Sequence, residues 1–221
     1  MVTKRSYEDG CAAAHALDLV GERWALLVVR ELILGPKRFT DLRAGLPAIS
    51  PNVLTERLDE LERSSVLRWR KLPPPASAWV YELTEWGREL EPAIMALGRW
   101  AARSPSLMEK PAPMGVDSLI LSFRTMFDAR AAKGLDARYE LRFGDDRFQA
   151  RVAGCRLDIE RGPAVRPDAV IETDSNTLAA IVYGGRKLAE ATRAGAVKIE
   201  GDKAAARRFI TLFPLPETAH A

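Results

Sequence analysis

The chain has 221 residues and a mass of 24.4 kDa, a length that suits two compact domains. Its composition, 47% hydrophobic and 29% charged, argues against a largely disordered chain. No apolar run reaches the roughly 18 residues of a membrane helix, and the opening stretch MVTKRSYEDG shows no secretion signal. Two distant cysteines exclude a disulfide scaffold and a zinc finger. We therefore expect a cytoplasmic protein without a membrane partner, whose net charge of +3 permits an anionic one.

Tryptophan and proline usage divides the chain into two parts. All five tryptophans lie within the first hundred residues, and a segment with three prolines follows at 104–115. A proline-rich polar segment of this kind is typical of an extended linker. The predicted divisions are an N-terminal domain at 1–103, a linker at 104–115, a C-terminal domain at 116–216 and a loose tail at 217–221.

The N-terminal part begins as a series of helices. Apolar residues recur at helical spacing in several segments, and glycine or proline follows each of the first three. Ser50-Pro51 opens the last segment with an N-cap residue and a proline at the first helical position, where its missing N–H costs nothing. The predicted helices are 12–20, 24–34, 41–46 and 50–64.

The hydrophobic period then changes from helical to alternating. Residues 66–72 and 79–83 read as two strands joined by a proline-rich tip, with Leu67 and Trp69 facing inward and the arginines between and after them facing outward. Thr84 caps a long helix that reaches about residue 103. Helix, turn, helix and hairpin in this order predict a winged helix-turn-helix, in which 50–64 takes the position of the recognition helix.

The charge distribution supports contact between this element and DNA. Residues 36–72 carry eight basic and five acidic side chains, whereas residues 1–103 carry 15 and 14. Asparagine suits adenine, glutamate accepts from cytosine N4, and basic residues hold phosphates. A solvated face of a helical protein–protein module is the alternative. The expected DNA-contacting residues are Ser50, Asn52, Thr55 and Glu56 at the leading end of the helix, and Arg38, Arg43, Arg57, Arg68, Arg70 and Lys71 as phosphate contacts.

A series of short segments between residues 11 and 103 carries a family resemblance. These segments include Leu17–Trp24, Arg30–Leu32, Arg38-Phe39, Leu46–Ser50, Leu54–Leu58 and Tyr81–Thr84. In this order they resemble the HxlR-type winged-helix transcription regulators. The resemblance implies a homodimer on a two-fold operator, recognition helices in successive major grooves and the hairpin as a wing over the minor groove. Ser65-Val66 departs from the glycine-led turn usual before the first wing strand.

Cys11 is the candidate redox sensor. Its place at a helix start lowers a thiol pKa, whereas Glu8 and Asp9 nearby oppose that effect. Some relatives in the HxlR-type family use a cysteine in this region as a sensor, and the resemblance extends that role to Cys11. A small buried residue in a dimer helix is the favoured alternative. His15 shares its face, but two ligands without a third do not make a metal site.

The C-terminal part reads as α+β. Its first three strands form a meander with one apolar and one charged face, which is typical of an antiparallel sheet solvated on one side. The predicted strands are 138–143, 147–152, 155–160, 169–173 and 197–200, and the predicted helices are 117–129, 174–182, 187–194 and 204–213. We expect an antiparallel-rich sheet covered by helices, so the fold class of the whole chain is α+β.

The segment Ala196–Asp202, followed by Phe209 and Leu212-Phe213, carries a looser resemblance. With it, residues 116–216 resemble the sterol carrier protein 2-like fold. This resemblance implies an apolar cavity of lipid size between sheet and helices. A filled core would use the same residues and is the alternative for each of them. The candidate wall residues are Phe143, Phe148, Val152, Leu157, Ile159, Ile181, Tyr183, Phe209 and Phe213.

Together these patterns favour a dimeric, sequence-specific DNA-binding transcription regulator modulated by an apolar, lipid-like or acyl small molecule. No GxSxG, P-loop or GxGxxG motif is present in the sequence, so we expect neither an enzyme nor a cofactor. The alternative is a lipid-binding carrier whose helical N-terminal half only dimerises. A third possibility is a closed C-terminal domain that serves only oligomerisation.

Overall fold

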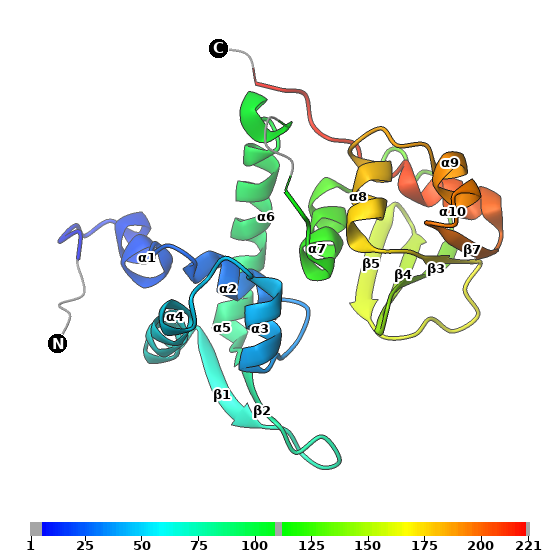
Figure 1. Cartoon of the computed structure of the whole chain (residues 1–221). Coiled ribbons are helices and arrows are strands. Elements are labelled where there is room, and N and C mark those ends of the chain that lie inside the picture. The colour runs from blue at the N-terminus through cyan, green and yellow to red at the C-terminus, as the bar shows by residue number, and fades with distance from the viewer. Residues whose placement is uncertain (1–5, 109–111, 220–221) are drawn as a thin grey trace. The chain divides into compact units, whose positions relative to one another are not determined.

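The computed structural model describes residues 6–108 and 112–219 (Figure 1). The chain divides into two units, Met1–Ile94 and Met95–Ala221, which are described separately. No helix among the described residues combines the length and apolar character needed to cross a membrane.

The first unit contains the predicted helices and hairpin. They are α1 (Ala12–Val20), α2 (Ala25–Leu32), α3 (Phe39–Gly45), α4 (Pro51–Arg63), β1 (Leu67–Lys71), β2 (Trp79–Leu83), α5 (Glu85–Arg88) and the start of α6 (Leu90–Ala101). Thr84 caps α5 as predicted, since its hydroxyl accepts a hydrogen bond from the Gly87 N–H at 3.0 Å. The long helix predicted to follow is interrupted at Glu89. Pro92 explains the break, because a proline ring clashes with the carbonyl four residues earlier in a continuous helix.

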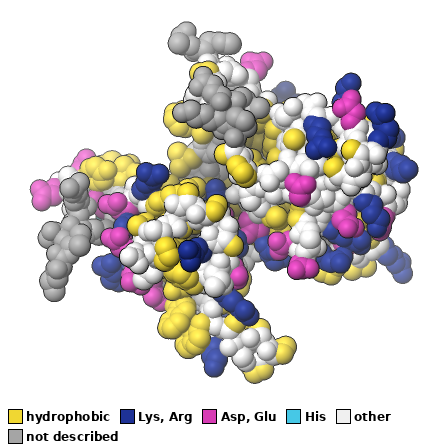
Figure 2. Space-filling view, in the orientation of Figure 1, with side chains coloured by type: hydrophobic (Ala, Val, Ile, Leu, Met, Phe, Trp, Pro, Cys, Tyr) yellow, Lys and Arg dark blue, Asp and Glu magenta, His cyan; other side chains and the backbone are white. Residues whose placement is uncertain are grey.

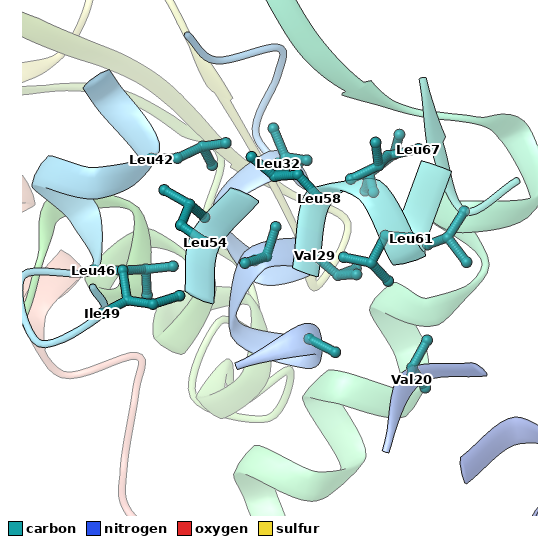
Figure 3. Close-up of a cluster of buried hydrophobic side chains, with 14 residues drawn as sticks. Val20, Val29, Leu32, Leu42, Leu46, Ile49, Leu54, Leu58, Leu61 and Leu67 are labelled. Carbon is teal, nitrogen blue, oxygen red and sulfur yellow. The ribbon is translucent and has the colours of Figure 1, made fainter. Parts of the chain in front are cut away.

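The core of this unit is built around α4 (Figure 3). Leu54, Leu58 and Leu61 recur at helical spacing and are at most 1% exposed. They belong to one buried cluster with Val28 and Val29 of α2. The cluster also contains Leu32, Leu42, Leu46, Ile49 and Leu67. Burial of this stripe fixes the rotation of α4, so its opposite face is exposed to solvent.

A left-handed residue joins α4 to the wing. Ser65 has φ 59°, and the Val66 N–H donates to the Leu61 carbonyl at 2.9 Å, which is the hydrogen bond of a Schellman motif. Ser65 therefore adopts the conformation for which glycine is usually chosen. The Ser65-Val66 turn lacks the glycine that is usual in the family. It still adopts the left-handed geometry that such a glycine would take.

The hairpin pairs in antiparallel register, with Leu67 opposite Leu83 and Trp69 opposite Tyr81. The prediction that Trp69 faces inward was wrong, because its side chain is 49% exposed. The hairpin reaches the buried cluster through Leu67 and Leu83 at its base, and Tyr81 packs against the cluster. Further out, Trp69 instead stacks on Trp79 with ring centroids 4.1 Å apart.

The second unit contains the rest of α6, a five-stranded sheet and four more α-helices (Figure 1). The strands are β3 (Ala137–Phe143), β4 (Asp146–Ala153), β5 (Arg156–Arg161), β6 (Ala169–Glu172) and β7 (Lys198–Gly201). The helices are α7 (Val116–Met126), α8 (Ser175–Val182), α9 (Leu188–Arg193) and α10 (Lys203–Ile210). The sheet order is β5-β4-β3-β6-β7, and β3 runs parallel to β6 while the other pairs are antiparallel. The sheet is therefore mixed and the fold is α+β.

The two faces of this sheet differ as the alternating pattern predicts. Tyr139, Leu141 and Phe148 are fully buried on one face. Arg138 and Gln149 alternate with them and are exposed on the other face. Helix-borne aromatic rings cover the apolar face, and the charged face is open to solvent over most of its area.

The connecting segment and the tail are more ordered than predicted. The segment 104–115 begins with a short 3-10 helix, η1 (Pro105–Met108), although an extended linker was predicted, and its residues 109–111 lie outside the described part. In the predicted tail, the Ala219 N–H donates to the Arg103 carbonyl at 2.7 Å and the Glu217 carbonyl accepts from the Arg103 side chain. Residues 220–221 are not described.

Candidate nucleic-acid interface

The leading end of α4 is capped and exposed. The Ser50 hydroxyl accepts from the Val53 N–H at 3.3 Å, and Pro51 occupies the first turn. Asn52 and Glu56 are both exposed, and the Glu56 carboxylate lies 3.2 Å from the Arg57 guanidinium. Thr55 is also exposed, but its hydroxyl donates to the Pro51 carbonyl at 3.0 Å, so it presents an acceptor and a methyl group. This end of the helix therefore offers polar groups of the kind that contact base edges.

The preceding helix, α3, carries two exposed arginines. Arg38 stands at the N-cap of α3, and Arg43 lies in its last turn. Both side chains are exposed, and neither forms an ion pair with any residue the structure describes. The Asp41 carboxylate accepts from the Arg38 backbone N–H at 3.1 Å and fixes the start of α3. Both guanidinium groups are thus available to an outside anion.

Arg57 does not occupy the predicted position of an exposed phosphate contact. Arg57 is only 7% exposed. Its guanidinium pairs with the Glu60 carboxylate and, at 3.2 Å, with the Glu56 carboxylate. Glu22, before α2, lies 3.9 Å away. Helical spacing explains this burial, because position 57 follows Leu54 by three residues and lies on the inward edge of the helix. Arg57 therefore joins α4 to the segment that precedes α2.

Replacing Arg57 by alanine is expected to lower the free energy of unfolding by about 2 kcal/mol, because the hydrogen bonds to charged partners are lost. The partly exposed carboxylates remain hydrated, which limits the loss. Urea unfolding followed by tryptophan fluorescence measures the change. Arg63→Ala, at the exposed end of the same helix, is the control and should change stability by less than about 0.5 kcal/mol. Equal destabilisation by both variants would contradict the assignment.

One face of the wing holds a cluster of three arginines around a single carboxylate. Glu82 is 8% exposed. It accepts from Arg70 Nε at 2.5 Å, from Arg68 Nη2 at 3.0 Å and from Arg88 Nη2 at 3.4 Å. The hydrogen bond from Arg70 is the largest cause that lowers the pKa of Glu82, with Arg68 acting in the same direction against the effect of burial. The cluster thus presents a net positive charge from oriented guanidinium groups.

The sequence reading included Arg68 and Arg70 but missed Arg88 and Glu82. Arg88 reaches the cluster because Thr84 caps α5 and turns the chain back beside β2. Lys71 is exposed on the other face of the hairpin, opposite Trp79 in register. Figure 2 shows basic and hydrophobic side chains side by side on the surface of this unit.

Acid is expected to loosen this cluster. A folded-state pKa of Glu82 below its ordinary value of 4.5 means that its charge stabilises the fold above the unfolded-state pKa. That contribution is lost as the pH falls through the lowered folded-state pKa, where Glu82 takes up a proton. An acid titration read by tryptophan fluorescence should show this loss for the wild type. Glu82→Gln should lack the step, and an identical titration of both proteins would contradict the prediction.

Cys11 is exposed at the N-cap position of α1. Hydrogen bonds from the backbone N–H groups of Ala13 and then Ala14 lower the pKa of its thiol. His15 lies one helical turn further on, and the described residues contain no group of three metal-ligating side chains around the pair. Cys11 is therefore accessible to solvent, and the pKa of its thiol is lowered from its ordinary value.

The thiol of Cys11 is expected to titrate at lower pH in the folded protein than in urea, since unfolding removes the two N–H donors. Thiolate absorbance during a pH titration measures both midpoints. A Cys155→Ser background isolates Cys11, and Cys11→Ser in that background should abolish the signal. Coincident midpoints in the folded and unfolded states would contradict the prediction.

The predicted cavity residues of the second unit fall into two groups. Phe209 and Phe213 lie 5.0 Å apart in a cluster of rings that also contains Phe123, stacked on Phe213 at 4.3 Å. Phe143 and Phe148 contact each other across the β3–β4 hairpin. Phe148, Val152, Ile159, Phe209 and Phe213 are at most 2% exposed, Phe143 and Ile181 are each 7% exposed, and Leu157 and Tyr183 are partly exposed.

The sequence reading missed two members of this ring cluster. Phe123 of α7 contacts Phe209 and Phe213, and Tyr139 of β3 lies 4.7 Å from Phe209. The Tyr139 hydroxyl is buried and has no hydrogen-bond partner among the described residues, and burial raises its pKa to about 12. The sequence did contain a signal for both residues, because Phe123 lies at helical spacing and Tyr139 at alternating spacing with other apolar residues.

An exposed helix end, a preceding helix with free arginines and an arginine-bearing hairpin define a winged helix-turn-helix DNA-binding unit. Residues 19–108 match the family described as HxlR-like helix-turn-helix. The HTH-type transcriptional regulator YdeP of Bacillus subtilis is 35% identical over 105 residues, 46% of this chain and 80% of YdeP. YodB of the same organism is 37% identical over 86 residues, 39% of this chain and 77% of YodB. The chain belongs to the HxlR-like helix-turn-helix family of transcriptional regulators.

A solved structure and a second family model also match parts of this chain. The solved structure of reduced YodB from B. subtilis aligns with 46% of this chain and 98% of that chain, at 33% identity and a TM-score of 0.38. Residues 110–220 match the family described as alkyl sulfatase C-terminal, so the second half of the chain belongs to that family. The resemblance of this half to the sterol carrier protein 2-like fold stays a prediction.

Proposed function

We propose that this regulator binds operator DNA as a homodimer and that a small apolar or acyl molecule in its C-terminal unit modulates the binding. The observation that carries the DNA-binding part is that one unit exposes the leading end of α4, two arginines of α3 outside any described ion pair and the arginine cluster of the wing. In this arrangement Asn52, Thr55 and Glu56 face base edges in the major groove. In the first turn of α4 the Asn52 N–H can donate to a phosphate, because Pro51 has no N–H and the Val53 N–H already donates to the Ser50 hydroxyl.

The basic residues around α4 divide by role in this proposal. Arg38 and Arg43 hold the backbone beside the major groove. Arg68, Arg70 and Arg88 grip the backbone beside the minor groove as one oriented cluster, with Lys71 on the other face of the hairpin. Arg57 has no phosphate contact in this arrangement, because its guanidinium is engaged by carboxylates of its own unit.

Exposed apolar side chains on two helices support the homodimer. Leu17 of α1 is 50% exposed. On α6, a helix of 12 residues with no buried residue, Leu97 is 50% and Trp100 is 74% exposed. Large apolar groups in solvent at helical spacing favour a partner surface. A second copy of the chain satisfies both helices and pairs two recognition helices on a two-fold operator.

The ring cluster of the second unit supports the effector. The Tyr139 ring belongs to this cluster and its buried hydroxyl has no partner among the described residues, so a bound molecule with a carbonyl or carboxyl oxygen would accept its hydrogen bond. Modulation then requires that this molecule bind the DNA-bound and free forms with different affinity. Native mass spectrometry of the protein after mild extraction tests whether a ligand co-purifies, and a closed C-terminal unit would yield none.

The names of two similar structures describe a quinone-bound YodB and an oxidised form of the redox regulator HypR. For this chain we propose that Cys11 is not required for regulation. Diamide treatment tests this directly, since wild type and Cys11→Ser should respond alike in DNA binding. Release of DNA from the wild type but not from Cys11→Ser would contradict the proposal and make Cys11 the sensor.

Selection of bound fragments from genomic DNA, followed by fluorescence anisotropy over a salt series, tests the DNA-binding proposal. We expect enrichment of a two-fold sequence and an affinity that falls steeply with salt. Asn52→Ala should relax the sequence preference, whereas Arg43→Ala should weaken all sequences alike and lower the salt slope by about 1. Lys133→Ala, an exposed residue of the second unit, is the control. Unselective recovery of fragments would favour a lipid carrier with a merely dimerising helical half.

A further inference from the structure

The open face of the second unit's sheet contains a groove of about 500 Å³. It is lined by residues of β3, β4 and β5 and by the loop that follows β5. Small-molecule sites typically measure roughly 300–1,000 Å³. The lining residue Arg138 precedes Tyr139 in β3 and therefore points to the opposite side of the sheet from the ring cluster. The groove is thus separate from the apolar site proposed above.

Charged side chains beside the groove form ion pairs with one another, whereas those that line the groove form none among the described residues. Glu140 is 3% exposed and pairs with Arg142 at 2.6 Å and Arg147 at 3.1 Å. No charged side chain that lines the groove forms an ion pair or side-chain hydrogen bond with any described residue. These unpaired residues are Arg138, Arg151, Asp158 and Glu160.

Two of these unpaired charges repel each other. Arg138 of β3 and Arg151 of β4 are direct partners in the antiparallel register. Side chains at such positions have Cβ atoms about 5 Å apart, and like charges there destabilise the sheet. An anion between them removes the repulsion. Two forked guanidinium groups suit the oxygens of a carboxylate or phosphate.

The loop that forms one wall of the groove is held in place by hydrogen bonds. The Ala164 N–H donates to the Glu140 carboxylate at 2.8 Å. The Arg138 N–H donates to the Asp168 carboxylate at 2.7 Å, and the Asp168 N–H donates to the Arg138 carbonyl at 2.8 Å. Val165 is 72% exposed on this wall and offers an apolar contact. The site is therefore shaped before a ligand arrives.

The other side of the groove carries two carboxylates, which require hydrogen-bond donors from a ligand. Asp158 lies opposite Arg151, and Glu160 lies opposite Gln149, one strand further across the sheet. Carboxylates only accept hydrogen bonds. We propose that the groove binds a small organic anion with hydroxyl or amino groups, its acid group between Arg138 and Arg151 and its donors toward Asp158 and Glu160.

Amide NMR spectra of the full-length protein, titrated with glycerate and with sn-glycerol 3-phosphate, test the proposal. The two probes carry the same hydroxyl donors on a carboxylate and on a phosphate. We expect saturable shifts at residues 149–151, 158–160 and 164–165 with at least one of them. Arg151→Gln and Arg138→Gln should each raise the Kd of the probe that binds by about tenfold, because each variant loses one charged hydrogen bond to the probe.

The controls separate the parts of the proposal. Arg207→Gln, an exposed arginine of α10 outside the groove, should leave the Kd within about twofold. Glycerol should cause no shift, and inorganic phosphate should bind more weakly than sn-glycerol 3-phosphate. Dispersed amide spectra confirm that each variant is folded. Absence of saturable shifts with both probes, or equal Kd values for wild type and both groove variants, would overturn the proposal. Equal binding of glycerol 3-phosphate and phosphate would overturn the role of the two acids.

Discussion

Replacing Arg68 and Arg70 together by alanine is expected to weaken binding to operator DNA by about tenfold to a hundredfold and to lower the salt slope by about 2. The reason is the geometry of the wing cluster. Glu82 holds both guanidinium groups on one face of the hairpin, so little side-chain entropy is lost when they meet a phosphate. Anisotropy with a labelled operator over a salt series measures both quantities.

The matched control replaces the same two arginines by lysine. Lysine keeps the charge but lacks the forked donors. The salt slope should therefore stay close to that of the wild type, while the affinity falls by about threefold. An alanine variant that binds with unchanged affinity and slope would place the wing away from DNA. A lysine variant as weak as the alanine variant would make geometry rather than charge the dominant contribution.

Gly87→Ala is expected to destabilise the first unit by about 3 kcal/mol or more, as severe overpacking does. A Cβ at this position would lie 1.9 Å from the Val66 carbonyl oxygen. That oxygen cannot move freely, since it accepts from the Thr84 N–H at 3.1 Å and from the Thr84 hydroxyl at 3.2 Å. The substitution therefore disrupts the junction of the wing with α5.

Urea unfolding followed by tryptophan fluorescence measures this effect, and all five tryptophans lie in the first hundred residues. Gly98→Ala is the matched control within α6. Its Cβ would meet only the Thr125 methyl group at 3.7 Å, an ordinary contact, and alanine favours a helix interior by up to about 1 kcal/mol. The two glycine variants should thus shift stability in opposite directions. A Gly87→Ala protein as stable as the wild type would contradict the prediction.

Local signals predicted most of the first unit. The helix from Ser50-Pro51 was predicted from its cap and first-turn proline, and the structure places α4 at Pro51–Arg63. The break at Glu89 was also readable, because Pro92 stands within one turn of it. The cluster around Glu82 was not readable, because it joins residues of β1, β2 and α5 whose meeting depends on strand register and on the turn at Thr84.

The second unit shows the same division between local and long-range information. Alternation predicted five strands near their observed positions, and the charged and apolar faces follow from it. The parallel pairing of β3 with β6 could not be predicted, since sheet order depends on contacts between distant segments. The facing of Arg138 and Arg151 depends on the register of the β3–β4 hairpin, which alternation alone does not specify, and the burial of Glu140 depends on the loop that follows β5.

Lys37 has a consequence for how any signal reaches DNA. Its backbone exchanges hydrogen bonds with Tyr81 of the wing at 3.0 and 2.8 Å, while its ammonium group holds the buried Glu31 of α2 at 2.6 Å. Strand and helix are thereby fastened to each other at the same residue. In the homodimer proposed above, the wing and α2 of one protomer therefore move together. An effector can then alter the distance between the DNA-binding units of the two protomers. This distance determines which spacing of operator half-sites they fit.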